Sequence, residues 1–237
     1  FFGSAVEVNF HNSINSIFED VNHENVEFGV VPIENSNQGS IKLTLDHLIQ
    51  EDIKICGEIN LTIKHCLLSN SKSVSNIKKI YAHEQTFLQC NEWLTRNIPN
   101  AKRIFCTSNS AAVKKIQNIV SSAAIASESC SALYKIPILK KNINDIVDNT
   151  TRFIVFGNHE TDPSGMDKTS IVVSVKNKAG ALKALLESLS INKISMTKIE
   201  SIPTKINNWE YMFLLDIVGH ANDKNVSIAL KEIKKKS

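Results

Sequence analysis

The segment GVVPIENSNQGS, residues 29–40, changes character halfway along its length. Residues 29–33 are apolar, as in a buried strand, whereas residues 34–38 carry a carboxylate, amides and a hydroxyl. Apolar side chains then recur at helical spacing over residues 41–49, which predicts a helix with Ser40 as its N-cap. A strand, a polar turn and a helix in this order indicate one unit of an α/β fold, and the polar side chains exceed what a turn requires.

The same alternation of strands and helices continues on both sides of this segment. Further strands are predicted over residues 6–10, 59–63, 77–82, 103–106, 123–126 and 153–156. Further helices are predicted over residues 14–21, from His83 and from Ala111. This order predicts an α/β domain with a largely parallel sheet.

A different pattern begins after residues 158–165, where turn-forming and charged residues indicate an interdomain linker. Beyond it the sequence predicts a strand over 171–175, a helix over 182–189, strands over 194–202 and 211–217, and a helix over 226–233. This βαββα order is one strand short of a ferredoxin-like βαββαβ unit.

The composition excludes several classes of protein. A hydrophobic fraction of 42% and a charged fraction of 22% are typical of a soluble globular chain. The net charge of +3 makes only a weak case for nucleic-acid binding, and no apolar run approaches the roughly 18 residues of a membrane span. The five cysteines are widely spaced without a C-x-x-C motif, which favours a reducing cytoplasm and argues against a zinc site.

Four polar clusters lie where predicted strands end, at residues 34–39, 82–85, 107–110 and 149–153. Ligands of open α/β sheets bind at the carboxyl ends of strands, and helix N-termini there favour anions. Arg152 adds a guanidinium that can hold a carboxylate through two hydrogen bonds. Together the clusters predict a site for a small polyanionic metabolite.

Each cluster also has a purely structural explanation. Helix capping alone would explain Ser40 and residues 107–110, and structural hydrogen bonds at a strand end would explain His83. Arg152 can pair with a protein carboxylate, and Glu34 can anchor its turn. The sequence contains neither the G-x-S-x-G elbow of a nucleophilic triad nor a phosphate-binding glycine motif.

Taken together, the motifs resemble those of prephenate dehydratase with a C-terminal ACT regulatory domain, over nearly the whole chain. The catalytic motifs are GVVPIENSNQGS at 29–40, AAIAS at 123–127 and NTTRFIVFG at 149–157, which is similar to the family's N-x-T-R-F signature. The ACT motifs are KNKAGAL at 176–182, KIESIP at 198–203 and WEYMFLLDIVGH at 209–220.

The resemblance implies a fold and a domain organisation. The fold is α/β, a two-lobed periplasmic-binding-protein-like catalytic domain followed by a ferredoxin-like βαββαβ ACT domain. The expected catalytic domain is 1–158, with lobe one at about 1–60 and 149–158 and lobe two at about 61–148; a linker at 159–168 and an ACT domain at 169–237 follow. Relative to the family pattern, the first catalytic strand with its glycine-rich turn and the last ACT strand are missing. Whether a chorismate mutase domain precedes residue 1 stays open.

The resemblance also implies an activity. The protein would be a cytoplasmic carbon–oxygen lyase that converts prephenate to phenylpyruvate in L-phenylalanine biosynthesis, without a metal or cofactor. L-Phenylalanine would act as feedback effector, and the chain would form a homodimer or homotetramer through its ACT and catalytic domains, with no nucleic-acid or membrane partner. Arogenate dehydratase and a non-catalytic amino-acid sensor are the alternatives.

The implied site residues follow from matching motif positions. Thr151 matches the catalytic threonine. The expected substrate-binding residues are Asn35, Ser36, Gln38, Gly39, His83, Gln85, Ser108, Asn109, Asn149, Arg152 and Phe153. The expected L-phenylalanine-binding residues are Asn177, Gly180, Ala181, Leu182, Glu200 and Ser201.

Three positions depart from the family pattern. Glu84 stands where S-H-P-Q has proline, Ile202 replaces the arginine of E-S-R-P, and Lys183 follows G-A-L. The last two departures put phenylalanine binding in question more than catalysis.

Overall fold

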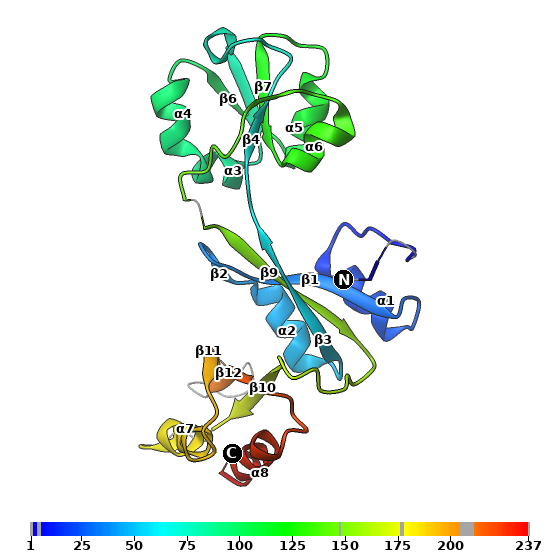
Figure 1. The fold of residues 1–237 in the computed structure, drawn as a ribbon, viewed down its shortest axis with the longest axis vertical. Coiled ribbons are helices and arrows are strands. Elements are labelled where there is room, and N and C mark those ends of the chain that lie inside the picture. The colour runs from blue at the N-terminus through cyan, green and yellow to red at the C-terminus, as the bar shows by residue number, and fades with distance from the viewer. Residues whose placement is uncertain (1, 4–5, 147, 176–177, 204–210, 237) are drawn as a thin grey trace. The chain divides into compact units, whose positions relative to one another are not determined.

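The computed structural model describes residues 2–3, 6–146, 148–175, 178–203 and 211–236. The chain divides into two compact units, and each is built from several stretches of sequence. Figure 1 labels the helices and strands along the chain. The first unit comprises Phe1–Asn9, Val30–Leu45 and Glu58–Ile154, and the second comprises Phe10–Gly29, Asp46–Gly57 and Val155–Ser237.

The first unit contains a five-stranded mixed sheet. Its strands are β4 (Cys66–Leu68), β5 (Lys79–Ala82), β6 (Lys102–Phe105), β7 (Ser122–Ala126) and β8 (Ile138–Lys140), in the spatial order β6-β5-β7-β4-β8. β5 pairs in parallel with β6 and β7, whereas β4 pairs antiparallel with β7 and β8. The predicted parallel arrangement therefore holds for β5, β6 and β7. The sequence did not reveal β4 and β8, because three residues are too short for a periodic pattern.

Helices cover both faces of this sheet. They are α3 (Glu84–Gln89), α4 (Asn91–Asn97), α5 (Asn109–Ile116) and α6 (Glu128–Tyr134), and a short 3₁₀ helix spans Val74–Asn76. Ile125 of β7 packs in one core cluster with Phe87 of α3 and residues of α4, whereas its neighbour Ala124 packs in another with Val113 of α5 and residues of α6. The alternation of side chains along β7 thus supplies both cores.

A second sheet has the order β2-β1-β9-β3. Its strands are β1 (Phe28–Asn35), β2 (Gly39–Ser40), β3 (Lys54–Thr62) and β9 (Thr150–Gly157). Along the chain, the helix α1 (Ile14–Asn22) precedes β1, and the helix α2 (Lys42–Gln50) lies between β2 and β3. The end of β1 and the beginning of β9 lie side by side within the first unit, where Ser36 N donates to Thr150 O over 2.9 Å. This pairing brings together two polar clusters that are more than 100 residues apart in the sequence.

An aromatic stack fills the part of this region that belongs to the second unit. Phe18 of α1 lies 4.3 Å from Phe156 of β9 and 4.2 Å from His47 of α2, measured between ring centroids. A Cβ on Gly29 would lie 2.4 Å from Phe156 Cζ, so only glycine leaves room for the stack.

Two local predictions for this region were wrong. Residues 6–10 form no strand; Val6, Val8 and Phe10 are exposed, and a strand needs a paired neighbour and a face to bury. Ser40 is not the N-cap of α2. It lies in β2, where it pairs with Glu34 of β1, and the helix begins only at Lys42.

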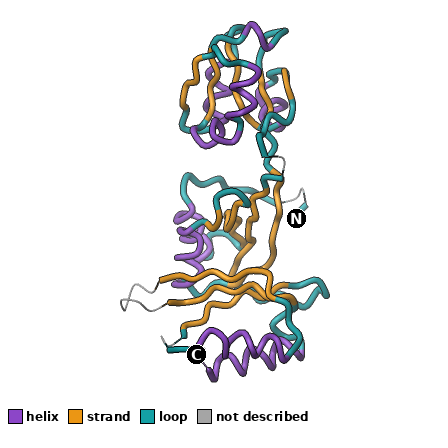
Figure 2. Tube along the Cα trace, turned by 90° about the vertical axis from the view of Figure 1, so that its left-hand side faces the viewer, coloured by secondary structure: helices purple, strands orange, loops and turns teal. Residues whose placement is uncertain are grey.

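The second unit ends in a three-stranded antiparallel sheet with two helices on one face (Figure 2). Its elements are β10 (Lys168–Ser174), α7 (Ala181–Ile191), β11 (Met196–Pro203), β12 (Tyr211–Val218) and α8 (Lys224–Lys236), and the sheet order is β10-β12-β11. Val173 and Leu215 of the sheet pack with Leu185 of α7 and Val226 of α8. The predicted βαββα order is confirmed.

The buried thiols provide a test of the first unit's core. Burial, and secondarily the Asp145 carboxylate, raises the pKa of the Cys90 thiol to about 12. Since the thiolate is the reactive form, we expect Cys90 to resist iodoacetamide at pH 8 in the folded protein and to react fully in denaturant. The more exposed Cys130 is the internal control. Mass spectrometry of the peptides reads both out, and rapid labelling of Cys90 in the folded protein would contradict this packing.

Candidate active site

A buried amide joins the ends of β1 and β9. Asn35 Nδ2 donates to Asn149 Oδ1 and to Thr151 Oγ1, both over 2.9 Å. Asn149 is 1% exposed and Asn35 is 7% exposed, whereas Thr151 is partly exposed. The structure therefore brings together three residues that the sequence predicted for one site, and Thr151 stands at its accessible side.

The turn after β1 is fastened to the start of β9. Ser36 Oγ accepts from Thr150 N over 3.0 Å and donates to Asp148 O over 3.2 Å. Within the turn, Gln38 N donates to Asn35 O over 3.2 Å. Gly39 closes it with φ of 77°, a left-handed conformation that favours glycine. Ser36, Gln38 and Gly39 thus hold the backbone around Asn35.

Arg152 is held by two protein carboxylates. Its Nη2 lies 3.1 Å from Glu34 Oε2 and its Nη1 lies 3.3 Å from Glu58 Oε2, and its side chain is 14% exposed. Successive strand residues point to opposite faces, so Arg152 and Thr151 project from opposite sides of β9. The pairing with protein carboxylates that the sequence allowed for Arg152 is thus present, and its role in substrate binding stays a prediction. Glu58 was not anticipated, because strand register cannot be read from local pattern.

A second polar cluster joins the N-termini of α3 and α5. Asn109 Oδ1 accepts from His83 N and from Thr86 Oγ1, both over 3.0 Å. His83 Nδ1 accepts from Gln85 N over 3.2 Å, so in the neutral ring Nε2 carries the proton and can donate. Ser108 Oγ caps α5 by accepting from Ala111 N over 3.0 Å. The predicted cap at the start of α5 is confirmed. His83, which the sequence indicated only as a strand-end residue, also caps α3.

Sequence reasoning missed Thr86, which is buried and completes this second cluster. Its place one helical turn after His83 was the available signal. Phe153 lies in β9, partly buried. Within the part of the chain that the structure describes, no hydrogen bond joins the two clusters.

Comparison with known proteins decides the family. The family model described as prephenate dehydratase matches residues 1–161. The chain belongs to the prephenate dehydratase family. A bifunctional chorismate mutase/prephenate dehydratase of Pseudomonas aeruginosa is 41% identical over 233 residues, which are 98% of this chain and 64% of that protein. The chain thus spans slightly under two thirds of the length of this curated relative.

Solved structures agree with this family. A prephenate dehydratase from Arthrobacter aurescens, in complex with L-Phe, has a TM-score of 0.84 at 29% identity, over 96% of this chain and 77% of the other. A quorum-quenching acylase also has a TM-score of 0.82, at 23% identity, over 96% of this chain and 84% of its own. The latter shows a likeness of fold alone, so the site has to carry the argument for function.

The predicted effector residues lie in the C-terminal elements. Gly180 immediately precedes α7 with φ of 84°, and Ala181 and Leu182 begin that helix. Glu200 and Ser201 are neighbours in β11, where Glu200 Oε2 lies 3.3 Å from Lys198 Nζ. Asn177 lies outside the described residues.

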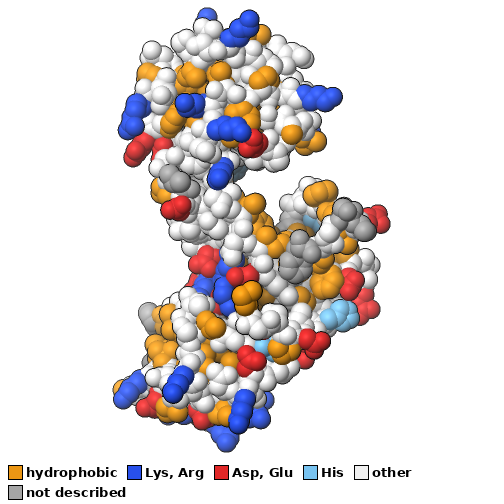
Figure 3. All heavy atoms as spheres, in the orientation of Figure 1, with side chains coloured by type: hydrophobic (Ala, Val, Ile, Leu, Met, Phe, Trp, Pro, Cys, Tyr) orange, Lys and Arg blue, Asp and Glu red, His pale blue; other side chains and the backbone are white. Residues whose placement is uncertain are grey.

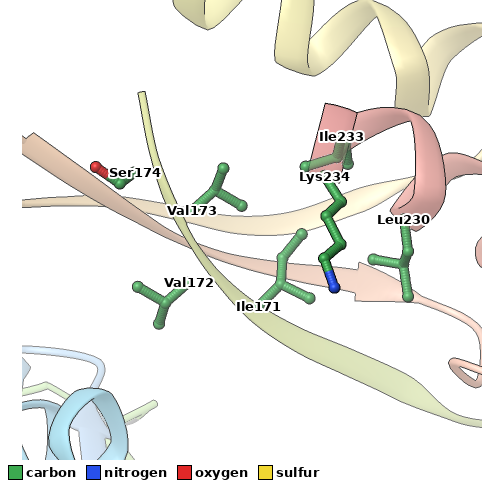
Figure 4. A pocket seen from close by; sticks show the side chains of 7 residues that line it. All are labelled: Ile171, Val172, Val173, Ser174, Leu230, Ile233 and Lys234. Carbon is green, nitrogen blue, oxygen red and sulfur yellow. The ribbon is translucent and has the colours of Figure 1, made fainter. Parts of the chain in front are cut away.

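A hollow of about 300 Å³ lies between β10 and α8 (Figure 4). Ile171 and Val173 point toward α8, and Leu230, Ile233 and Lys234 come from the helix. Its lining is mostly apolar and includes none of the predicted site residues, so it does not suit a dianionic substrate.

The described residues contain no group of three or more His, Cys, Asp or Glu side chains that could hold a metal ion. None of the helices described is both long and apolar enough to span a bilayer. Figure 3 shows acidic and basic side chains interspersed on the visible face.

Proposed function

We propose that this chain catalyses the decarboxylating dehydration of prephenate to phenylpyruvate in L-phenylalanine biosynthesis. The observation that carries the proposal is the Thr151 hydroxyl, held by the buried Asn35 amide at the accessible start of β9. Family membership and the 41% identical bifunctional relative support it. Because the chain spans 64% of that relative's length, its substrate, activity and partners are proposals.

The chemistry requires one proton at one oxygen. Prephenate is a dianion; as its ring carboxylate leaves as carbon dioxide, the released electron pair enters the ring and the C4–O bond breaks toward oxygen. The departing hydroxide takes up a proton and leaves as water, so dianion plus proton gives phenylpyruvate, carbon dioxide and water. Thr151 donates its hydroxyl proton to this oxygen, and solvent then replaces the proton on Thr151. A positioned donor of this kind accelerates a reaction by about 10²–10⁴-fold.

The remaining polar groups orient the substrate. His83 offers Nε2–H, while Gln85, Ser108, Asn109 and Phe153 belong with it to the proposed binding surface. Ser36, Gln38, Gly39 and Asn149 shape the backbone and side chains around Asn35. Fixing the substrate in a reactive geometry removes part of the entropic barrier. No metal or cofactor enters the proposed reaction.

The C-terminal βαββα elements belong to the proposed regulatory domain. We assign residues 1–158 to a two-lobed catalytic domain, 159–168 to a linker and 169–237 to a ferredoxin-like ACT domain. L-Phenylalanine would bind in this domain near Gly180 and Glu200, and the chain would form a homodimer or homotetramer. The five free cysteines favour a cytoplasmic location. The Arthrobacter aurescens relative is described as a complex with L-Phe. Calorimetry with L-phenylalanine tests this, and absence of heat at millimolar ligand counts against it.

The experiment that tests the activity uses purified protein and two substrates. Prephenate is supplied, phenylpyruvate is followed by its absorbance, and the enzyme-free rate is subtracted. Arogenate is tested in parallel with detection of phenylalanine, because a preference for it would identify an arogenate dehydratase. If L-phenylalanine gives heat of binding but neither substrate gives product, the protein would be the alternative, a non-catalytic amino-acid sensor.

A further inference from the structure

We propose that Asn35 is a positioning residue whose amide fixes the direction in which Thr151 donates its hydroxyl proton. The inference deepens the proposed function and rests on it. The inference follows from the donor and acceptor atoms of a hydrogen-bond network formed by Asn35, Asn37, Asn149 and Thr151.

The orientation of the Asn35 amide is set by the backbone. Asn37 N donates to the Asn35 side chain over 3.0 Å. Because a backbone N–H can only donate, the atom that it meets must be the amide oxygen. The other end of the Asn35 amide is then the NH₂ group, which can donate two hydrogen bonds and accepts no hydrogen bond.

This assignment fixes the roles of both neighbours. The Asn35 NH₂ group lies 2.9 Å from Asn149 and 2.9 Å from Thr151, so its two protons go to these two residues. Asn149 must therefore present its oxygen, and Thr151 must accept through Oγ1. The Thr151 proton cannot point at Asn35.

The Thr151 proton remains available to a ligand. The hydroxyl has one proton, and the residues that the structure describes place no acceptor within hydrogen-bonding distance of it. Thr151 is partly exposed, whereas the other two side chains of the network are buried. The open direction of the hydroxyl is the one in which a substrate oxygen can approach.

The network keeps this direction at a cost in stability. Asn149 Nδ2 is buried and has no partner among the described residues. An unsatisfied buried donor costs about 1–3 kcal/mol. Turning the Asn149 amide over would set its NH₂ against the NH₂ of Asn35, so the arrangement holds the polarity of the network and leaves one donor unmatched. A buried donor without a partner calls for an explanation, and a role in a catalytic site is one such explanation.

Polarity matters because the leaving oxygen also carries lone pairs. A Thr151 proton turned back toward β1 would present oxygen lone pairs to the departing hydroxide, and the two would repel. Asn35 prevents that rotamer through its hydrogen bond to Thr151 Oγ1. It therefore acts on the rate of the chemical step and hardly on substrate affinity.

Asn35→Asp reverses the polarity with nearly the same shape. The new carboxylate still accepts from Asn37 N, but it now draws the Thr151 proton to itself. We expect kcat to fall about 100-fold or more, within the range of a lost general acid, while KM rises by a smaller factor because the new carboxylate repels the dianion. As pH falls, protonation of the carboxylate restores a donor toward Thr151, so kcat relative to wild type rises.

The charged groups near position 35 are the same in the variant and in wild type. Glu34 precedes it in β1, Arg152 and Glu58 form the ion pairs on the opposite face, and Asp148 lies before Asn149. Normalising each rate to wild type at the same pH removes their contribution, and the enzyme-free conversion of prephenate is subtracted at every pH.

A double-mutant cycle separates polarity from simple charge repulsion. In a Thr151→Ala background Asn35→Asp should cost less than threefold more, because its effect passes through the hydroxyl. Full additivity, a KM effect larger than the kcat effect, or a single variant within fivefold of wild type at neutral pH would overturn the inference. Absence of turnover in wild type would instead overturn the proposed function and this inference with it.

Discussion

Thr151→Val is expected to reduce kcat for phenylpyruvate formation by about 10²–10⁴-fold. Valine keeps the shape of threonine and removes the hydroxyl that accepts from Asn35 and faces the accessible side of β9. The leaving oxygen then loses its donor. Asn35 keeps Asn149 as an acceptor, so the free energy of unfolding should change by no more than about 1 kcal/mol.

The matched control is Thr150→Val, the same substitution one residue earlier and on the opposite face of β9. Its backbone bonds to Ser36 do not depend on the side chain, so turnover should stay near wild type. Thr151→Ser keeps a hydroxyl and should retain most of the activity. Turnover of Thr151→Val near that of wild type would exclude Thr151 as the donor.

The local features of this site could be predicted because they depend on neighbouring residues. Ser108 Oγ accepts from the backbone N–H three residues further on, and a sequence shows such a cap directly. For His83 the sequence predicted the start of a helix but not the bond from Gln85 N to its ring. The strand β1 could be read from its apolar residues, although the structure extends it through the polar Glu34 and Asn35.

The non-local features could not be predicted from local pattern. Asn35 and Thr151 are 116 positions apart, and only the resemblance to a family placed them in one site. The partner of Arg152 in β3 depends on strand order and register, which residue periodicity does not specify. The exposed segment at residues 6–10 shows the converse, since an alternating pattern without a paired neighbour forms no strand.

Arg152→Met carries the largest expected effect on stability among the site residues. The substitution leaves Glu34 and Glu58 without the cation that they share, in a region where the arginine side chain is 14% exposed. Loss of charged hydrogen bonds in such a place costs about 2 kcal/mol. In a chain of this size that corresponds to a fall of about 4–8 °C in the unfolding midpoint, measured by circular dichroism.

The control for Arg152→Met is Lys141→Met, which removes an ion pair with Glu128 whose two side chains are 58% and 65% exposed. Exposed pairs contribute about 0–1 kcal/mol, so this midpoint should hardly move. The kinetics of Arg152→Met decide between the two roles of the arginine. An unchanged midpoint with a KM for prephenate raised tenfold would mean that Arg152 binds a substrate carboxylate. A lowered midpoint that Glu34→Gln partly reproduces would mean that the guanidinium anchors β9 to β1 and β3 and so holds Thr151 in place from the opposite face.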